Sequence, residues 1–233
     1  MEGDEAMKRI KKRYASYRVQ LGNLVQELAS KMPAGSDLRG VEVGVHRGDT
    51  SGYLLERFPC LTLHMVDWWT PAAKESEYWQ SGDRMARESA DERLDAYRAA
   101  VSVTLPYGMR ARIMVGDSVE SARLINHASG LVDFAFIDGD HTYDGVVRDL
   151  AAYWQLLRPG GLFSGHDYAH RRYVGVKQAV DEHAERNSLL VSSGQGKVWW
   201  MWKPENTFDP DGAISEAQHK NFSLGTFPGE RTK

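Results

Sequence analysis

Short apolar runs alternate with stretches of helical periodicity along most of the chain. The apolar runs cover residues 41–45, 61–66, 111–115, 131–137 and 160–165. Segments with helical spacing lie between and after them, at about 50–58, 83–104, 118–128, 144–157 and 173–186. Strands that alternate with helices indicate βαβ units and a mostly parallel sheet. Continuous apolar runs are typical of strands that are buried on both faces of such a sheet.

Two further apolar runs near the end of this pattern predict a hairpin. Residues 188–192 and 197–202 are separated by a few residues that include Gly194 and Gly196. A short connection that contains glycine favours antiparallel pairing of the two runs. We therefore expect an antiparallel hairpin at one edge of the sheet.

Segments outside the alternating pattern divide the chain into three parts. Residues 7–31 place apolar side chains at spacings of three and four, which predicts an N-terminal helix within residues 1–36. Residues 37–203 form the predicted α/β domain, and residues 204–233, rich in Pro, Gly, Asn and charge, are expected to form a flexible tail. Inside the domain, a polar insertion at 70–84 follows the second strand and is a candidate lid.

Composition narrows the expected setting and partners. The 233 residues carry a net charge of -3, which argues against general nucleic-acid binding, although Lys8–Arg13 is a local basic run. No stretch reaches the about 18 apolar residues of a membrane span. The single cysteine, Cys60, and the acidic start without a signal peptide predict a cytoplasmic protein. The amphipathic first helix is a candidate interface for a homodimer.

The first apolar run leads into a glycine turn that could bind a ligand. Glu42 precedes Gly44, and Gly48 follows at the start of the next predicted helix. Glycines allow the backbone to approach a ligand closely, and a helix N-terminus offers unpaired N–H groups. The spacing is G-x-x-x-G and not the G-x-G-x-x-G that binds a dinucleotide pyrophosphate. A structural turn without a ligand would also explain this motif taken alone.

Polar residues follow each of the next three strands. Asp67 closes the second run, where a carboxylate can accept both hydroxyl groups of a ribose. The polar residues after the third and fourth runs are Asp117, Ser118, Asp138, Asp140 and His141. One acid after a strand is usually a helix N-cap. Because open α/β sheets bind ligands at the carboxyl ends of their strands, the recurrence of such residues predicts a site at this edge.

The order of these motifs resembles that of class I S-adenosylmethionine-dependent methyltransferases. The resemblance rests on Glu42-x-Gly44-x-x-x-Gly48, Asp67, Gly116-Asp117-Ser118, Ile137-Asp138-Gly139-Asp140-His141-x-Tyr143, Leu157-Arg158-Pro159-Gly160-Gly161 and Gly165-His166-Asp167-Tyr168. It covers roughly residues 38–203 and is nearest to small-molecule O-methyltransferases, including the metal-dependent sugar-tailoring and catechol-type branches. The resemblance implies a Rossmann-like three-layer α/β sandwich with a seven-stranded, mostly parallel sheet.

The same resemblance implies that the cofactor is S-adenosylmethionine and that the acceptor is a small molecule. The residues expected around the cofactor are Glu42, Gly44 and Gly48 at its methionine part, Asp67 at the ribose, Trp68, Asp117 and Ser118 at the adenine, and Asp138. Trp69 could flank the adenine too, but at least one of this tryptophan pair is expected to pack in the core.

Methyl transfer to a hydroxyl group also requires a proton acceptor beside the methyl carbon. Asp138, Asp140 and His141 follow the fourth strand, where the acceptor would lie, and are the candidate catalytic residues. His166 and Asp167 follow the fifth strand and, with Asp138, could hold Mg²⁺ or another divalent metal ion. A histidine at that position departs from the metal-dependent branches, since Mg²⁺ prefers oxygen ligands. Helix capping by Asp138 and Asp140 is the alternative without catalysis.

Other functions fit parts of this pattern. A nicotinamide-dependent oxidoreductase could use a similar sheet, but the first turn lacks the third glycine of its motif. A non-catalytic binding module would keep the fold and the cofactor residues without turnover. A nucleic-acid methyltransferase is supported only by Lys8–Arg13, and the fourth strand is followed by IDGDHTY in place of an Asn-Pro-Pro-Tyr-type loop.

Overall fold

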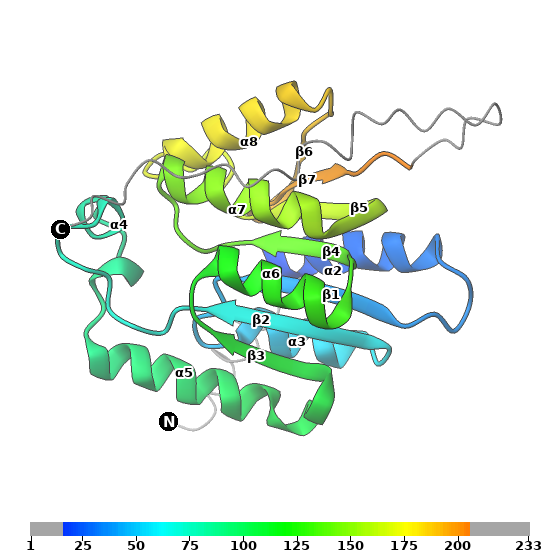
Figure 1. Cartoon of the computed structure of the whole chain (residues 1–233), viewed down its shortest axis with the longest axis horizontal. Helices are drawn as coiled ribbons and strands as arrows, with labels where there is room; N and C mark the ends of the chain where they lie inside the picture. The colour runs from blue at the N-terminus through cyan, green and yellow to red at the C-terminus, as the bar shows by residue number, and fades with distance from the viewer. Residues whose placement is uncertain (1–15, 206–233) are drawn as a thin grey trace, which may run out of the picture.

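A seven-stranded sheet forms the centre of the computed structural model, which describes residues 16–205 (Figure 1). The strands are β1 (Leu38–Val43), β2 (Leu61–Asp67), β3 (Ala111–Val115), β4 (Val132–Ile137), β5 (Leu157–Gly165), β6 (Ser192–Ser193) and β7 (Trp199–Trp202). Their order across the sheet is β3-β2-β1-β4-β5-β7-β6. The first five strands are parallel, whereas β7 is antiparallel to both β5 and β6. The predicted sheet with an antiparallel edge hairpin is confirmed.

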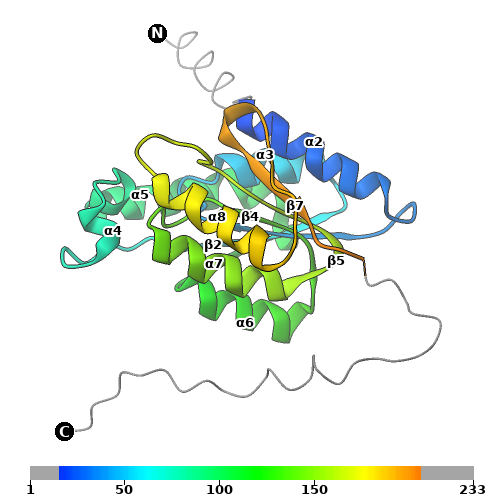
Figure 2. The ribbon, with the colours of Figure 1, turned by 90° about the horizontal axis from the view of Figure 1, so that it is seen from above.

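Helices cover both faces of the sheet and complete the expected three layers (Figure 2). The helices of one face are α2 (Ser16–Ser30), α3 (Asp49–Arg57) and α5 (Ala90–Thr104). Those of the other face are α6 (Ser118–Ser129), α7 (Tyr143–Leu156) and α8 (Val174–Arg186). The shorter helices are α4 (Glu77–Gln80), η1 (Met85–Arg87), η2 (Leu105–Arg110) and η3 (Gln195–Lys197). Each face of the sheet therefore has its own apolar core.

The two cores explain the continuous apolar runs of the central strands. β4 is buried along its whole length. In β2, Leu63 and Met65 point into the core beneath α3 and α5, whereas Val66 points into the core beneath α6 and α7. β3 is an edge strand, and Val115 at its end is 59% exposed, so the expected burial on both faces does not hold there.

The helix predicted from residue 83 begins seven residues later, at Ala90 of α5. Ser89 and Glu92 form a capping box, in which the Ser89 hydroxyl accepts from the Glu92 N–H and the Glu92 carboxylate accepts from the Ser89 N–H. This reciprocal pair satisfies two N–H groups at the start of the helix and fixes its first turn. The residues before it are free to form the separate turns α4 and η1.

The strand predicted at residues 188–192 is nearly absent. Only β6, at Ser192–Ser193, pairs with β7. The preceding residues close α8, because the Leu189 N–H donates to the Ala184 carbonyl oxygen (2.9 Å) and Ser188 has a positive φ of 54°. The apolar side chains of this run therefore end a helix.

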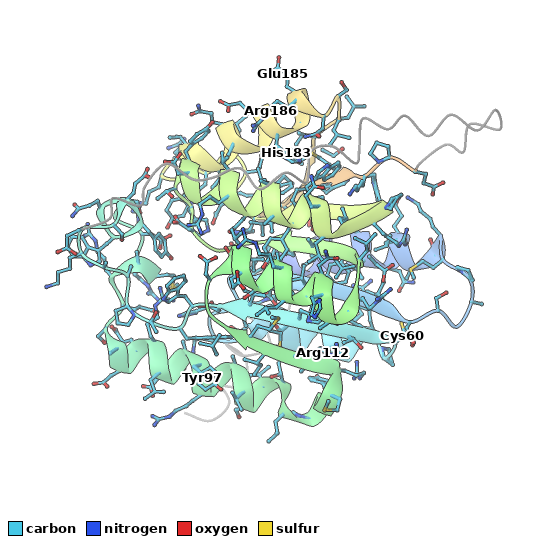
Figure 3. The ribbon with its side chains drawn as sticks, in the orientation of Figure 1. Cys60, Tyr97, Arg112, His183, Glu185 and Arg186 are labelled. Atoms are coloured by element: carbon cyan, nitrogen blue, oxygen red, sulfur yellow. The ribbon has the colours of Figure 1, made fainter. Side chains whose placement is uncertain are left out.

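The sheet and its insertion define one functional edge. The strand order reverses between β1 and β4, and open α/β sheets bind ligands beyond the carboxyl ends of the strands at such a point. The insertion at residues 68–89, which includes α4, lies at this edge (Figure 1). Cys60, directly before β2, is exposed at the opposite edge (Figure 3).

Parts of two predicted segments lie outside the described residues. These are the beginning of the first helix with the basic run Lys8–Arg13, and the predicted tail from residue 206 onward. Between residues 16 and 205, no helix is both long enough and apolar enough to cross a membrane.

Candidate active site

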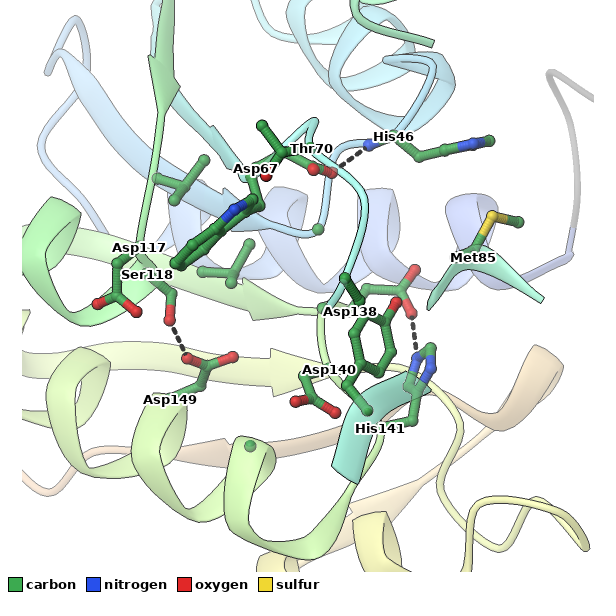
Figure 4. A pocket seen from close by; sticks show the side chains of 18 of the residues that line it. His46, Asp67, Thr70, Met85, Asp117, Ser118, Asp138, Asp140, His141 and Asp149 are labelled. Atoms are coloured by element: carbon green, nitrogen blue, oxygen red, sulfur yellow. Dashed lines mark hydrogen bonds and ion pairs between the residues drawn. The ribbon is translucent and has the colours of Figure 1, made fainter. Parts of the chain in front are cut away.

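A cavity of about 470 Å³ lies at the carboxyl edge of the sheet (Figure 4). Its volume is in the range of roughly 300–1,000 Å³ that is typical of small-molecule sites. The predicted site residues that line it are Gly44, Asp67, Trp68, Asp117, Ser118, Asp138, Asp140 and His141. Thr70, Ala73 and Tyr78 also line it, so the insertion predicted as a lid forms one wall of the cavity.

The glycine turn after β1 brings the ends of β1 and β4 together. Gly44 has a φ of +88°, and its N–H donates to the Val66 carbonyl oxygen (2.9 Å). A Cβ atom at Gly44 would lie 2.0 Å from the carbonyl oxygen of Asp138. Only glycine fits this position, because any side chain would push the two strand ends apart.

Two residues expected at the cofactor do not line the cavity. Gly48 is the N-cap of α3 with a φ of +77°, and a Cβ atom there would lie 2.9 Å from the Cα atom of Ala100. Glu42 is buried and accepts a hydrogen bond from the Ser51 hydroxyl. Burial raises the pKa of Glu42 to about 8. Glu42 therefore contacts α3 through Ser51, and Gly48 allows the start of α3 to lie close to Ala100 of α5.

Asp67 at the end of β2 fixes two loops of the site. Its Oδ2 accepts from the His46 N–H (2.7 Å) and its Oδ1 accepts from the Trp69 N–H (2.9 Å). The Arg93 guanidinium lies 3.9 Å from Oδ1. A carboxylate oxygen has two lone pairs, so each oxygen of Asp67 keeps one for a ligand in the cavity.

The end of the cavity at β3 contains the residues expected near the adenine. Asp117 caps α6 by accepting from the N–H groups of Val119 and Glu120, and it also pairs with Arg148 (2.8 Å). Ser118 lies beside it at the cavity wall.

The two tryptophans after β2 have different surroundings. Trp68 is 53% exposed and lines the cavity. Trp69 is buried, donates its Nε1–H to the His46 carbonyl oxygen (2.7 Å) and packs edge-on against Tyr97. The expectation that at least one of the pair would be buried in the core is confirmed.

At the opposite end of the cavity, Asp138 and His141 belong to a cluster of acids and histidines. The other members, His166 and Asp167 after β5, lie behind the cavity lining. His141 Nε2 lies 3.4 Å from Asp138 Oδ1 and 3.2 Å from Asp167 Oδ2. His166 Nδ1 lies 3.5 Å and 3.2 Å from the same two oxygens. Donor atoms of Asp138, His141 and Asp167 fall within 4.8 Å of one another, which is close enough for one metal ion. Figure 4 shows Asp138 and His141 at this end and Asp117 and Ser118 at the other.

The carboxylates hold both imidazoles of this cluster in the charged form. Burial alone would lower the pKa of His141, but hydrogen bonds and charges of Asp138 and Asp83 outweigh burial and raise it to about 10. Asp138 and Asp167 raise the pKa of His166 to about 10 against the same effect of burial. The cluster is therefore built to hold positive charge between its acids.

Comparison with known proteins agrees with this geometry. A family model described as a methyltransferase domain matches residues 41–168, more than half of the chain. The chain belongs to the methyltransferase domain family. It is a class I S-adenosylmethionine-dependent methyltransferase.

Solved structures with a similar fold include the calicheamicin methyltransferase CalS11, with a TM-score of 0.58 and 13% sequence identity over 78% of this chain and 77% of that chain. The O-methyltransferase NovP gives a TM-score of 0.53 and 16% identity over 85% and 80% of the two chains. Cofactor-bound Rv0187 from MTB gives 0.51 and 13% over 82% and 92%. At these identities the likeness shows the fold. No curated protein matches the sequence.

The methyltransferase brings the expected metal-binding residues together and adds one more. The sequence predicts Asp138, His166 and Asp167, and His166 Nδ1 lies close to oxygens of both acids. His141 also converges on Asp138 and Asp167. His166 remains at the edge of the cluster, where its ring packs against Tyr17 with centroids 4.7 Å apart. Asp140 lines the cavity and accepts from the Thr142 N–H (2.8 Å).

Sequence reasoning missed one acid of the cavity that left a visible signal. Asp149 lies on α7 between Val146 and Leu150, on the apolar face of that helix. Its carboxylate accepts a hydrogen bond from the Ser118 hydroxyl, and burial raises its pKa to about 7. An acid among the apolar positions of a helix is a recognisable sign of a buried polar contact.

Other missed residues come from the insertion and the helix after it. They are Asp83, Glu88 and Arg93. Arg93 is buried, lines the cavity and donates to the Met85 carbonyl oxygen (2.5 Å). These residues carry no sequence signal, because their positions depend on how the insertion folds back over the sheet.

Proposed function

We propose that this methyltransferase transfers the methyl group of S-adenosylmethionine to a hydroxyl group of a small molecule. One observation carries the proposal: a single cavity joins the ribose-binding and adenine-binding candidates after β2 and β3 to Asp138, Asp140 and His141 after β4. His141 in turn contacts Asp167 after β5. A methyl donor placed along it has its nucleoside at one end and its reacting carbon near the groups that can manage a proton. NovP, whose fold is similar, is an O-methyltransferase.

The cavity offers each part of the cofactor a suitable group. In the proposed complex, the free lone pairs of Asp67 accept the two ribose hydroxyl groups. Trp68 and the start of α6 at Asp117 and Ser118 border the adenine. The methionine part lies along the Gly44 turn and extends toward Asp138. We assign Glu42 and Gly48 no direct contact with the cofactor, since they do not line the cavity.

The proton of the acceptor hydroxyl needs a base on the same side as the methyl carbon. In the transfer, the hydroxyl oxygen forms a bond to the methyl carbon, the carbon–sulfur bond breaks, and sulfur keeps the electron pair. A pKa of about 10 leaves His141 protonated at neutral pH, so it is unsuited to act as the base while its acids remain around it. We assign the base to Asp140, whose side chain lines the cavity beside this cluster.

The donor set of Asp138, His141 and Asp167 fits a divalent metal ion. Two carboxylate oxygens and one imidazole nitrogen suit Mn²⁺ or Zn²⁺ better than Mg²⁺, which prefers oxygen alone. A bound ion would replace the proton on His141 Nε2 as the positive charge between the two acids. It would supply a lower pKa for the acceptor hydroxyl.

Transfer of a labelled methyl group to a panel of small hydroxyl compounds tests this function. We expect excess EDTA to abolish transfer and Mn²⁺ to restore it. Asp138→Asn and Asp167→Asn should lower turnover about 100-fold or more with small changes in cofactor affinity, because they act at the reacting end. Asp144→Asn, an exposed acid in the first turn of α7, is the matched control.

Full activity in excess EDTA, with no metal found by elemental analysis, would contradict the proposed metal ion. It would leave the proposed methyl transfer unaffected. Binding of S-adenosylhomocysteine without transfer to any acceptor would instead support a non-catalytic binding module.

A further inference from the structure

His141 has a second charged partner, on the side of the ring that faces away from the cluster. Its Nδ1 lies 2.6 Å from Oδ2 of Asp83, which belongs to the insertion between β2 and α5. The Asp83 side chain is only 2% exposed. The two residues are 58 positions apart in the sequence, so the contact forms only when the insertion folds onto the end of β4.

Asp83 is itself held in one orientation. Its Oδ1 accepts from the Met85 N–H (2.8 Å), and its own N–H donates to the Ser81 hydroxyl (3.2 Å). One carboxylate oxygen is thus bound inside the insertion and the other is left to face the imidazole. A carboxylate fixed in this way acts as a rigid acceptor with a defined direction.

Two further contacts fix the plane and the far side of the His141 ring. The Tyr173 ring stacks on it, with centroids 4.5 Å apart and an angle of 15° between the planes. With Nδ1 donating to Asp83, the opposite nitrogen Nε2 is directed at Asp138 and Asp167. The partner of one ring nitrogen sets what the other nitrogen can do, whether that is to donate a proton or to ligate a metal ion.

We propose that Asp83 is a positioning residue, which orients His141 so that Nε2 faces the acids of the reacting end, and that the insertion thereby completes the active site when it closes over the cofactor cavity. The proposal rests on the proposed function for its catalytic meaning. Asp83 itself does not line the cavity and does not touch the reacting atoms.

The Asp83→Asn variant tests this with little change of shape. The amide oxygen can keep the bond from the Met85 N–H, while its NH₂ group can donate to Nδ1 only if Nδ1 gives up the proton that it carries in the charged parent imidazole. Nitrogen-15 spectra of histidine-labelled protein report which ring nitrogen carries a proton, and His141→Gln assigns the signal. We expect the Nδ1–H signal of His141 to be lost in Asp83→Asn.

A second readout uses Mn²⁺ alone as the probe. Loss of an outer carboxylate partner typically weakens metal binding by about 10–100-fold, and we expect that loss in Asp83→Asn. The affinity for S-adenosylhomocysteine should stay within about 2-fold of that of the parent protein. If the substitution instead unfolded the insertion, which forms one wall of the cavity, this affinity would fall too. Glu77→Gln, an exposed acid of the same insertion, should leave both the spectrum and the affinities unchanged.

An unchanged His141 signal in Asp83→Asn would overturn the proposal. A loss of S-adenosylhomocysteine binding as large as the loss of Mn²⁺ binding would also overturn it, because Asp83 would then be a structural residue of the insertion. Failure of the proposed function gives a different result. In that case the parent protein binds no S-adenosylhomocysteine, while its spectrum still shows whether Asp83 holds His141.

Discussion

Asp67 combines a structural role with the proposed binding role. It accepts hydrogen bonds from the His46 and Trp69 N–H groups and also lines the cavity. Because a carboxylate that accepts two hydroxyl groups contributes on the order of 2–3 kcal/mol, Asp67→Ala should weaken S-adenosylhomocysteine binding by about 10–100-fold. Titration calorimetry measures this. Unchanged affinity would show that Asp67 does not bind the ribose. A parallel thermal melt shows how much of any loss of affinity comes from loosening the loops that Asp67 holds at His46 and Trp69.

His64 gives the fold an acid-sensitive position away from the site. It lies on β2, is 4% exposed, and both of its ring nitrogens are buried without a hydrogen-bond partner. Burial lowers the pKa of His64 to about 4. In the unfolded chain His64 has its ordinary pKa near 6.5, so the unfolded state takes up a proton at a higher pH than the folded state does. The contribution of His64 to the free energy of unfolding is therefore complete above pH 6.5 and is lost as the pH falls toward 4.

Between about pH 7 and about pH 5, His64 should lower the free energy of unfolding by an amount on the order of 2 kcal/mol. His64→Leu should therefore flatten the fall in unfolding free energy over this range, as measured by urea unfolding at the two pH values. His183, which is buried on α8 with a similarly lowered pKa, is unchanged in that variant and accounts for part of the remaining dependence. Identical pH dependence in His64→Leu and the parent would contradict the account.

At the scale of elements, the Gly44 turn decides how closely β1 and β4 approach. Gly44→Ala places a Cβ atom 2.0 Å from the Asp138 carbonyl oxygen, in addition to the positive φ. Gly35 is a matched control, because its φ is +82° and no heavy atom lies within 4 Å of its Cβ position. Gly35→Ala should cost only about 1–3 kcal/mol of backbone strain.

Gly44→Ala should lower the unfolding free energy by clearly more than the control, as measured by chemical denaturation, and should weaken S-adenosylhomocysteine binding because Asp138 must move. Equal effects of the two substitutions would show that strand approach at Gly44 is not critical.

The elements differ in how well the sequence predicts them. β2, β3 and β4 end within a residue of their apolar runs. For β2 and β4 the reason is that parallel strands buried on both faces need apolar side chains throughout, whereas β3 is a partly exposed edge strand. The strand predicted at 188–192 forms only at Ser192, since Ser188 and Leu189 follow α8 and close its last turn. The insertion was predicted only as a candidate lid, because its turns depend on contacts such as that of Asp83 with His141, between residues far apart in the sequence.

The site follows the same rule. Residues at the ends of regular strands, such as Asp67 and Asp138, could be placed from the sequence because topology brings strand ends together. Residues whose roles depend on the direction of the side chain could not be placed from the sequence. His141 joins Asp138 and Asp167 beside the expected His166, and Glu42 accepts a hydrogen bond from Ser51 and does not line the cavity.

For the whole molecule, the central claim is that the cavity at the carboxyl edge of the sheet binds S-adenosylmethionine. The arrangement of β1 to β4 and the insertion makes one continuous site from Asp117 to His141. The glycine turn does not have the spacing that binds a dinucleotide pyrophosphate.

Titration calorimetry of the parent protein with S-adenosylhomocysteine, and separately with NAD, tests this claim most directly. We predict one binding site for S-adenosylhomocysteine, with a Kd of roughly micromolar order, and no measurable heat with NAD. Binding of NAD in place of S-adenosylhomocysteine, or of neither compound, would contradict the account.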